Sequence, residues 1–324
     1  MKQKKWRQVW AAAALCAFGV SAAVAADAYP QRAIRMIVPY PPGGAGDIVG
    51  RMLSAKLTEY LGQQVVVDNR GGGGQLIATQ LAAKSEPDGY TLFLASATHG
   101  INPGLRNNLP YDTVKDFAPI TLVAESPLVF VAHPSLGVTN IKDLVAYAKA
   151  KPGQITYGSS GPGTGGHLSV ELLKWMTQTD MVHVPYKGAG PALTDLIGGQ
   201  LQLICTSPLP AMPHVKAGRL KALAMTSRTR SRSYPDIPTV AETLPGYEST
   251  LWYALLAPAG TPNAIIKRVH DETVRALKAS DVADQLAKQG ADPVGNSPAE
   301  LQKFIQAEIA RWTKVIRAAN ITAN

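Results

Sequence analysis

Glycine and hydroxyl-bearing residues gather in two segments of the sequence, residues 38–47 and 157–168. Each segment follows a short apolar run and precedes an apolar pattern with helical spacing, which predicts a strand, a turn and a helix. Glycine lets the backbone approach a ligand closely because it has no Cβ. The first amides of a helix have no partner within the helix, so a helix start attracts anions. The two segments therefore predict the two halves of a carboxylate site.

Hydroxyl groups strengthen this interpretation for the second segment, where Ser159, Ser160 and Thr164 could donate to a carboxylate. A helix start stabilises a nearby negative charge by about 0.3–1 kcal/mol. Two such starts facing one cleft could hold a dicarboxylate without any arginine. For each segment the alternative is a capped helix start behind a glycine-rich turn, and Asp47 could cap its own helix instead of contacting a ligand.

The first 26 residues have the features of an export signal. Basic side chains within residues 2–7 precede an apolar run, Val9–Val20, and small residues lead to Ala26. This run is shorter than the roughly 20 residues that span a bilayer, so we expect a cleaved signal peptide over residues 1–26 and a periplasmic protein. The mature chain keeps one cysteine, Cys205, so no internal disulfide is expected.

The charge balance argues against a nucleic-acid partner. The formal charge falls from +9 to +5 once the four Lys and Arg residues of the signal are removed. The local basic cluster at residues 228–232 has no interleaved aromatic residues, which favours a solvated loop.

The order of the predicted elements indicates an α/β protein. Strands and helices alternate over residues 34–95 and again over 141–225, which predicts two doubly wound sheets. A β-rich segment at 117–132 and another at 251–257 could cross between them. We therefore expect a discontinuous first lobe (27–123 and 251–324), a second lobe (124–250) and a ligand cleft between them.

No pattern of catalytic residues is evident. Ser160 lacks the G-x-S-x-G context because Pro162 replaces the last glycine, and no pair of histidines has H-E-x-x-H spacing. Residues 161–166 are spaced like a P-loop, but His167 follows where lysine is needed. We therefore expect no catalysis, cofactor or metal. A catalytic triad whose residues come together only in the folded protein would not be visible in sequence spacing.

Several motifs, in this order along the chain, resemble those of the Bug family, the periplasmic solute receptors of tripartite tricarboxylate transporters. They are Val38-Pro39-Tyr40-Pro41-Pro42-Gly43-Gly44, Pro87-Asp88-Gly89-Tyr90-Thr91-Leu92, Tyr157-Gly158-Ser159-Ser160-Gly161, Val184-Pro185-Tyr186-Lys187-Gly188, and Trp252-Tyr253 with Ala257-Pro258-Ala259-Gly260-Thr261-Pro262. The resemblance spans nearly the whole mature chain. It implies a type II periplasmic-binding-protein fold (Venus flytrap) with a hinge, no catalysis and a membrane permease as partner. It also implies a carboxylate held by backbone amides, hydroxyls and water.

The resemblance implies ligand-binding residues in both lobes and at the returning hinge. They are Tyr40, Gly43, Gly44, Asp47, Ser96, Ala97 and Thr98 in the first lobe, Ser159, Ser160, Thr164, Gly165, His167, Tyr186, Gly188 and Thr206 in the second, and Trp252 and Tyr253 at the hinge. As alternatives, His167 could be a packed polar residue, and Tyr186 and Trp252 could be core aromatics.

Thr206 stands where many relatives carry aspartate, which could pair with a substrate ammonium group. Threonine cannot, so the predicted ligand is a carboxylic acid without an amino group, either aliphatic or aromatic. The predicted function is a monomeric extracytoplasmic receptor that binds a di- or tricarboxylate or an aromatic acid and delivers it to the transporter. A sensor that reports the ligand to a signalling membrane protein, or a periplasmic hydrolase, remain the alternatives.

Overall fold

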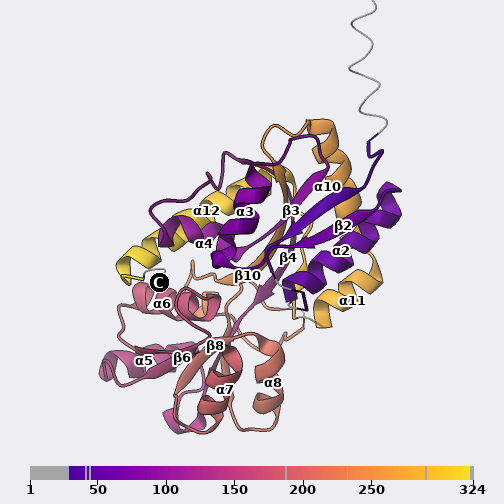
Figure 1. Cartoon of the computed structure of the whole chain (residues 1–324). Helices are drawn as coiled ribbons and strands as arrows, with labels where there is room; N and C mark the ends of the chain where they lie inside the picture. The colour runs from indigo at the N-terminus through magenta and orange to yellow at the C-terminus, as the bar shows by residue number, and fades with distance from the viewer. Residues whose placement is uncertain are drawn as a thin grey trace, which may run out of the picture.

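Two β-sheets, each flanked by helices, form the architecture of this computed structural model (Figure 1). The structure describes residues 29–321, except Pro41, Gly44, Lys187, Arg232 and Gln289, so the predicted signal peptide lies outside the described residues. None of the helices described is both long and apolar enough to cross a membrane.

The first sheet has six strands in the order β11-β4-β10-β3-β1-β2. They are β1 (Ile34–Val38), β2 (Val65–Asn69), β3 (Thr91–Ser96), β4 (Phe117–Pro127), β10 (Thr250–Pro258) and β11 (Asp292–Pro293). The strands β1, β2 and β3 are parallel, whereas β10 runs antiparallel to both β3 and β4. The sheet is therefore mixed, because β10 runs in the opposite direction to both of its neighbours.

The helices associated with the first sheet come from both ends of the chain. They are α2 (Ala45–Leu61), α3 (Leu76–Ala83), α4 (Ala97–Leu105), α10 (Asn263–Leu277), α11 (Ser280–Lys288) and α12 (Pro298–Ala318), with the short 3-10 helix η1 (Gly73–Gln75) before α3. The C-terminal helix α10 packs on α2 and β4, so the C-terminal part of the chain completes this half of the molecule.

The second sheet has five strands in the order β7-β6-β8-β5-β9. They are β5 (Val129–Ala132), β6 (Thr156–Ser159), β7 (Val182–Pro185), β8 (Leu203–Thr206) and β9 (Lys221–Met225). The helices of this half are α5 (Ile141–Ala150), α6 (Gly165–Thr177), α7 (Ala189–Ile197), α8 (Pro208–Lys216) and α9 (Val240–Thr243), with the 3-10 helix η2 (Pro134–Leu136).

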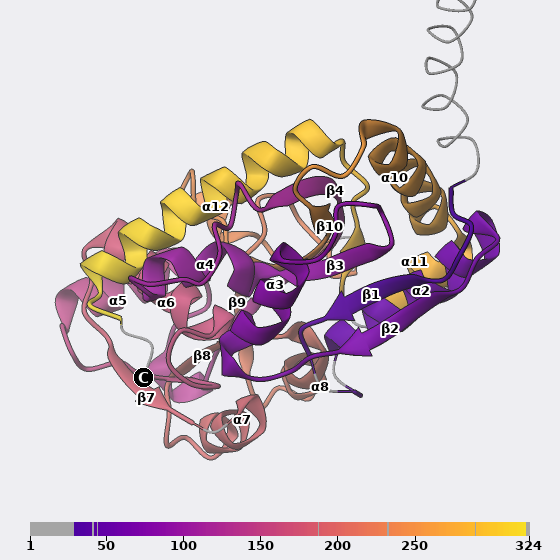
Figure 2. The same cartoon turned by 45° about the horizontal axis from the view of Figure 1, so that its top comes forward.

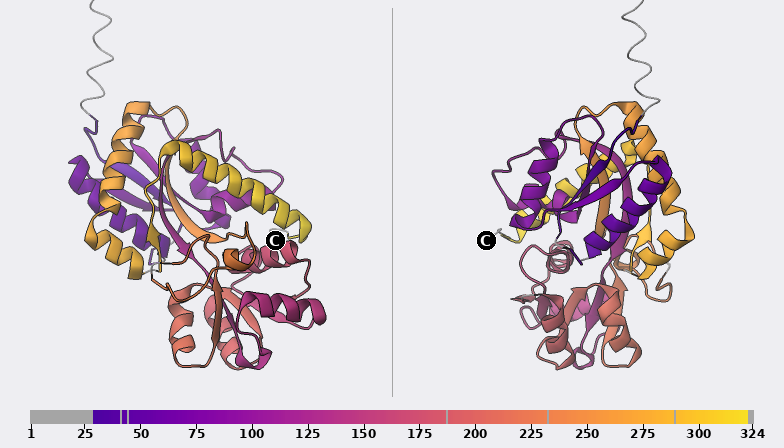
Figure 3. Two further views of the ribbon diagram at one scale, coloured as in Figure 1. Left: turned by 180° about the vertical axis from the view of Figure 1, so that it is seen from behind. Right: turned by 45° about the vertical axis from the view of Figure 1, so that its right-hand side comes forward.

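The chain passes between the sheets at two adjacent places, seen from behind and from the side in Figure 3. β4 ends in the first sheet at Pro127 and β5 begins in the second at Val129. At the residue between them, the backbone amide of Leu128 donates to Thr226 Oγ1 (2.8 Å), and the Thr226 amide donates to the Leu128 carbonyl (2.9 Å). Thr226 directly follows β9, and its carbonyl accepts from the Ser249 amide (2.9 Å), one residue before β10 begins, so Thr226 joins the outgoing segment to the returning one.

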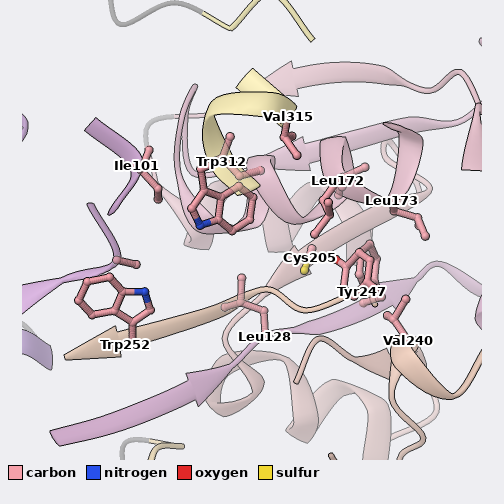
Figure 4. Close-up of a cluster of buried hydrophobic side chains, with 14 of the residues drawn as sticks. Ile101, Leu128, Leu172, Leu173, Cys205, Val240, Tyr247, Trp252, Trp312 and Val315 are labelled. Atoms are coloured by element: carbon pink, nitrogen blue, oxygen red, sulfur yellow. The ribbon is translucent and has the colours of Figure 1, made fainter. Parts of the chain in front are cut away.

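The last helix, α12, connects the two halves by packing, because it contacts α4 and β4 of the first half and α6 of the second (Figure 2). Its start has a complete capping box between Ser297 and Glu300. Trp312 and Val315 of this helix belong to a buried cluster that also holds Ile101 and Leu172 (Figure 4). A continuous apolar core therefore extends across the junction.

Three α-helices among the described residues were not predicted from the sequence, α4, α8 and the four-residue α9, and the first two contain residues that disfavour helices. α4 contains Gly100, Pro103 and Gly104. Its packing on α12 explains them in part, since a Cβ at Gly104 would lie 2.9 Å from Ile316 and one at Gly100 would lie 3.1 Å from Glu308. Close approach to α12 thus overrides the weak helix propensity.

Candidate functional site

A cavity of about 490 Å³ lies where loops of the two halves meet. Its walls come from the β1–α2 turn, η1, both ends of α4, the turn before α6 and the start of β10. The lining residues are Tyr40, Gly74, Ser96, Ala97, Thr98, Ile101, Asn102, Leu105, Arg106, Pro162, Gly163, Thr164, Gly165, Leu251, Trp252 and Tyr253. Eight of the predicted residues are among them: Tyr40, Ser96, Ala97, Thr98, Thr164, Gly165, Trp252 and Tyr253.

The start of α4 is the first part of the cavity with free hydrogen-bond donors. Ser96 stands at the N-cap position in an extended conformation, but its side chain does not cap the helix. Its Oγ donates instead to Gln75 Oε1 (2.8 Å). Ala97 and Thr98 line the cavity directly after it, so the first turn of α4 meets the cavity without a side-chain cap.

The start of α6 has the same property on the opposite side. Thr164 is the N-cap residue and makes no capping bond, because its hydroxyl donates to the Gly161 carbonyl (2.7 Å). Gly165 and Gly166 allow tight packing here: a Cβ would lie 2.7 Å from Leu251 at the former and 2.2 Å from the Cys205 carbonyl at the latter. Two helix starts, one from each half, thus meet in one cavity without side-chain caps, an arrangement that attracts an anion.

The start of α2 differs, because Asp47 occupies it. This carboxylate is buried, with 3% of the residue exposed, and it accepts from the Gly43 amide (2.9 Å), Asn69 Nδ2 (2.9 Å) and Arg51 Nε (3.0 Å). Burial alone would raise the pKa of Asp47, but these hydrogen bonds hold the pKa below its usual value. Neither Gly43 nor Asp47 lines the cavity, and Gly44 lies outside the described residues.

Tyr40 is the residue of the first glycine-rich segment that reaches the cavity. Its ring covers the first turn of α2, where a Cβ at Gly46 would lie 2.2 Å from the ring. It also meets Tyr253 edge to face, with 6.2 Å between ring centroids. Burial raises the pKa of both phenols, so both are neutral hydrogen-bonding groups at physiological pH.

Ser159 and His167 of the second segment hold the loop that lines the cavity. His167 Nδ1 accepts from the Gly163 amide (3.0 Å), and Ser159 Oγ contacts His183 Nε2 (2.7 Å) and the Gly161 amide (3.1 Å). The two imidazole rings stack with 3.9 Å between centroids. Burial, followed by the neighbouring His183, lowers the pKa of His167 to about 3, so the ring accepts as a neutral group.

The other predicted residues of the second half do not line the cavity. Tyr186 donates its hydroxyl to Asp195 (2.7 Å), Gly188 precedes α7, and Thr206 is buried at the end of β8. Ser160 is exposed in the turn after β6. Their roles in ligand binding stay predictions.

The apolar wall of the cavity is fixed from behind by a buried carboxylate. Trp252 Nε1 donates to Glu308 Oε2 (2.9 Å), which also accepts from Trp312 Nε1 (3.0 Å). Burial raises the pKa of Glu308, while Arg311 and the two indoles oppose that shift. Trp252 is thus a core aromatic that also lines the cavity, and its role in ligand binding stays a prediction.

Arg106 is the main lining residue that the sequence did not suggest, since we expected a site without cationic side chains. Its Nε is buried and has no hydrogen-bond partner among the described residues. An unsatisfied buried donor costs about 1–3 kcal/mol. The available signal was spacing: Thr98, Asn102 and Arg106 share one face once residues 97–105 are recognised as a helix.

A larger hollow, of about 1160 Å³, lies between α5, α6 and the end of α12. It contains none of the predicted site residues, and the helix start that it meets, that of α5, is already capped by the Asn140 side chain. We therefore place the ligand site in the smaller cavity. The described residues contain no cluster of three or more metal-ligating side chains.

The fold and the cavity together define a two-lobed solute-binding receptor. A family model described as the tripartite tricarboxylate transporter family receptor matches residues 49–321. The chain therefore belongs to this family, whose members are periplasmic receptors.

Relatives agree over nearly the full length. BugT of Bordetella pertussis is 40% identical over 302 residues, which are 92% of this chain and 93% of that protein. The adipate-bound structure of Rpa4515 from R. palustris is 36% identical, with a TM-score of 0.73 over 91% of this chain and 99% of that one. Malate-bound MatC from Rhodopseudomonas palustris is 32% identical, with a TM-score of 0.70 over 89% and 100%. The predicted fold class and family are confirmed.

Proposed function

We propose that this protein binds a small carboxylate in the 490 Å³ cavity and delivers it to the membrane permease of a tripartite transporter. The observation that carries the proposal is the meeting of two helix starts, those of α4 and α6, without side-chain caps. Their first-turn amides supply donors and a positive field to an anion. The adipate and malate bound by the similar proteins support a ligand of this class.

Binding is coupled to closure of two lobes, residues 27–123 with 251–324 and residues 124–250. A carboxylate that touches both helix starts stabilises the closed form, so the ligand shifts the population towards closure. The crossings at Leu128 and Ser249, which Thr226 joins by hydrogen bonds to both, form the hinge. The receptor acts as a monomer, without catalysis, after export and removal of residues 1–26.

Isothermal titration calorimetry of the mature chain with a panel of small carboxylates tests the ligand class. Each acid is paired with its neutral primary amide, because the amide keeps the shape and removes the charge. We expect at least one acid to bind and its amide to bind at least 100-fold more weakly, since the helix starts recognise the charge. Equal binding of an acid and its amide, or no binding by any acid, would contradict the proposal.

The preference for an acid without an amino group rests on Thr206 and is tested by titrating succinate against aspartate. Succinate should bind more tightly, because no carboxylate follows β8 to pair with the ammonium group.

Mass spectrometry of the exported protein should find Asp27 at the N-terminus, and uptake of the identified acid should fail in a deletion strain. Unimpaired uptake in that strain would count against the transport role and favour a sensor.

A further inference from the structure

We propose that Arg106 forms a second anion site in the same cavity, so that the preferred ligand is a dicarboxylate with an apolar body. This inference rests on the proposed function, because it assigns the first carboxylate to the starts of α4 and α6. It adds a charged side chain that recognises the other end of the ligand.

The position of Arg106 separates the two anion sites along one helix. Ser96 precedes α4 and Arg106 follows it, and both line the cavity. The guanidinium lies near η1, where a Cβ at Gly74 would be 3.2 Å from Arg106 Nη2. The Gly74 carbonyl accepts from Asn102, in the second turn of α4, so the guanidinium reaches back along the helix to η1.

Arg106 makes no ion pair within the part of the chain that the structure describes. Other arginines of this protein do: Arg35 pairs with Asp68, and Arg230 pairs with Glu242. The neighbouring Asn102 amide is already engaged with the Gly74 carbonyl (3.1 Å) and the Tyr111 hydroxyl (3.3 Å). The buried Arg106 Nε thus has no acceptor among the described residues, and a ligand carboxylate would supply one.

Part of the wall between the two sites is apolar, beside Thr98 and Asn102. Ile101 and Leu105 of α4 line it on one side, and Leu251 and Trp252 of β10 line it on another. Leu105 also reaches the opposite half, because a Cβ at Gly163 would lie 3.3 Å from it. A ligand that spans the cavity therefore presents carbon to these four side chains between its two charged ends.

Calorimetry with two matched pairs of probes tests this inference: adipate against hexanoate, and benzene-1,4-dicarboxylate against benzoate. Each pair keeps the carbon body and differs by one carboxylate. We expect the diacid of at least one pair to bind the wild-type protein about tenfold or more tightly than its monoacid. Arg106→Met should remove this preference by weakening the diacid and leaving the monoacid within about twofold.

Two further variants separate charge recognition from a structural role. Arg106→Lys keeps the charge and should retain most of the diacid preference, whereas Arg32→Met removes an exposed arginine outside the cavity and should change nothing. Thermal unfolding of each variant checks that it is folded. An Arg106→Met protein that is folded and keeps the full diacid preference would overturn the inference and leave the carboxylate receptor intact. A wild-type protein that binds none of the four probes or any other carboxylate would contradict the proposed function itself.

Discussion

The starts of α2 and α6 follow similar glycine-rich turns in the sequence, yet the structure uses them differently. At α2 the protein supplies its own anion, because Asp47 accepts from the Gly43 amide within the turn. At α6 the equivalent residue is His167, whose neutral imidazole accepts from the Gly163 amide, so this turn is held without an anion, and the N-cap hydroxyl of Thr164 donates to the Gly161 carbonyl. α4, which follows β3, has the same open start. A helix start is thus available to a ligand only where the chain does not already satisfy it.

The largest effect is expected when an open start is given its own carboxylate. Thr98→Asp places an acid on the first turn of α4 inside the cavity, and we expect it to lower the affinity for the bound acid by about 100-fold through repulsion. Stability should be unchanged or slightly higher, since an acid favours a helix start. Ala45→Asp, on the exposed first turn of α2, is the control and should leave affinity within about twofold. Equal losses in both variants would show that the two starts do not differ.

Removing the internal anion should affect stability more than binding. Asp47→Asn weakens a buried, hydrogen-bonded carboxylate and should lower the free energy of unfolding by about 2 kcal/mol at pH 7, with little change in affinity. The pKa of Asp47 is lowered in the folded state, so its contribution is present above the ordinary pKa and disappears as the pH falls through the folded value. Urea unfolding at pH 7 and pH 3 measures both. Glu59→Gln, exposed on the same helix, serves as the neutral reference, and a loss of affinity without a loss of stability would refute this role.

Acid should weaken the turn before α6, because a neutral imidazole holds it. The pKa of His167 falls to about 3 on folding, so the unfolded chain binds a proton first, and stability drops as the pH falls below about 6.5. From pH 7 to pH 5 we expect His167 to contribute a loss of roughly 1–2 kcal/mol. His167→Gln should flatten this part of the profile in urea titrations and leave the part due to His183. An unchanged profile would mean that His167 is protonated in the folded protein.

The smallest effect concerns the N-cap hydroxyls themselves. Ser297 caps α12 in a complete capping box, so Ser297→Ala should cost about 1 kcal/mol in chemical unfolding. Thr164 caps nothing, so Thr164→Ala should cost less, about 0.5 kcal/mol. A larger cost at Thr164 than at Ser297 would indicate that Thr164 satisfies the start of α6 after all.

Hydrophobic periodicity was sufficient to predict the alternating strands and helices and the two β-rich connecting segments, because burial dictates those patterns. It missed α4, whose Gly100 and Gly104 report packing on α12 instead of helix propensity. Arg106 was missed with it, since its place in the cavity depends on the register of that helix. The sequence alone could not decide whether Asp47 caps its helix or contacts a ligand. The deciding feature is the hydrogen bond from the Gly43 amide to the Asp47 carboxylate, which depends on the folded geometry of the turn.

A crystal structure of the protein with a bound diacid such as adipate tests the central claim most directly. We expect one carboxylate within hydrogen-bond distance of the first-turn amides of both α4 and α6, in the cavity lined by Thr98 and Gly165. A carboxylate bound instead at the start of α2, or in the hollow between α5 and α6, would contradict the account.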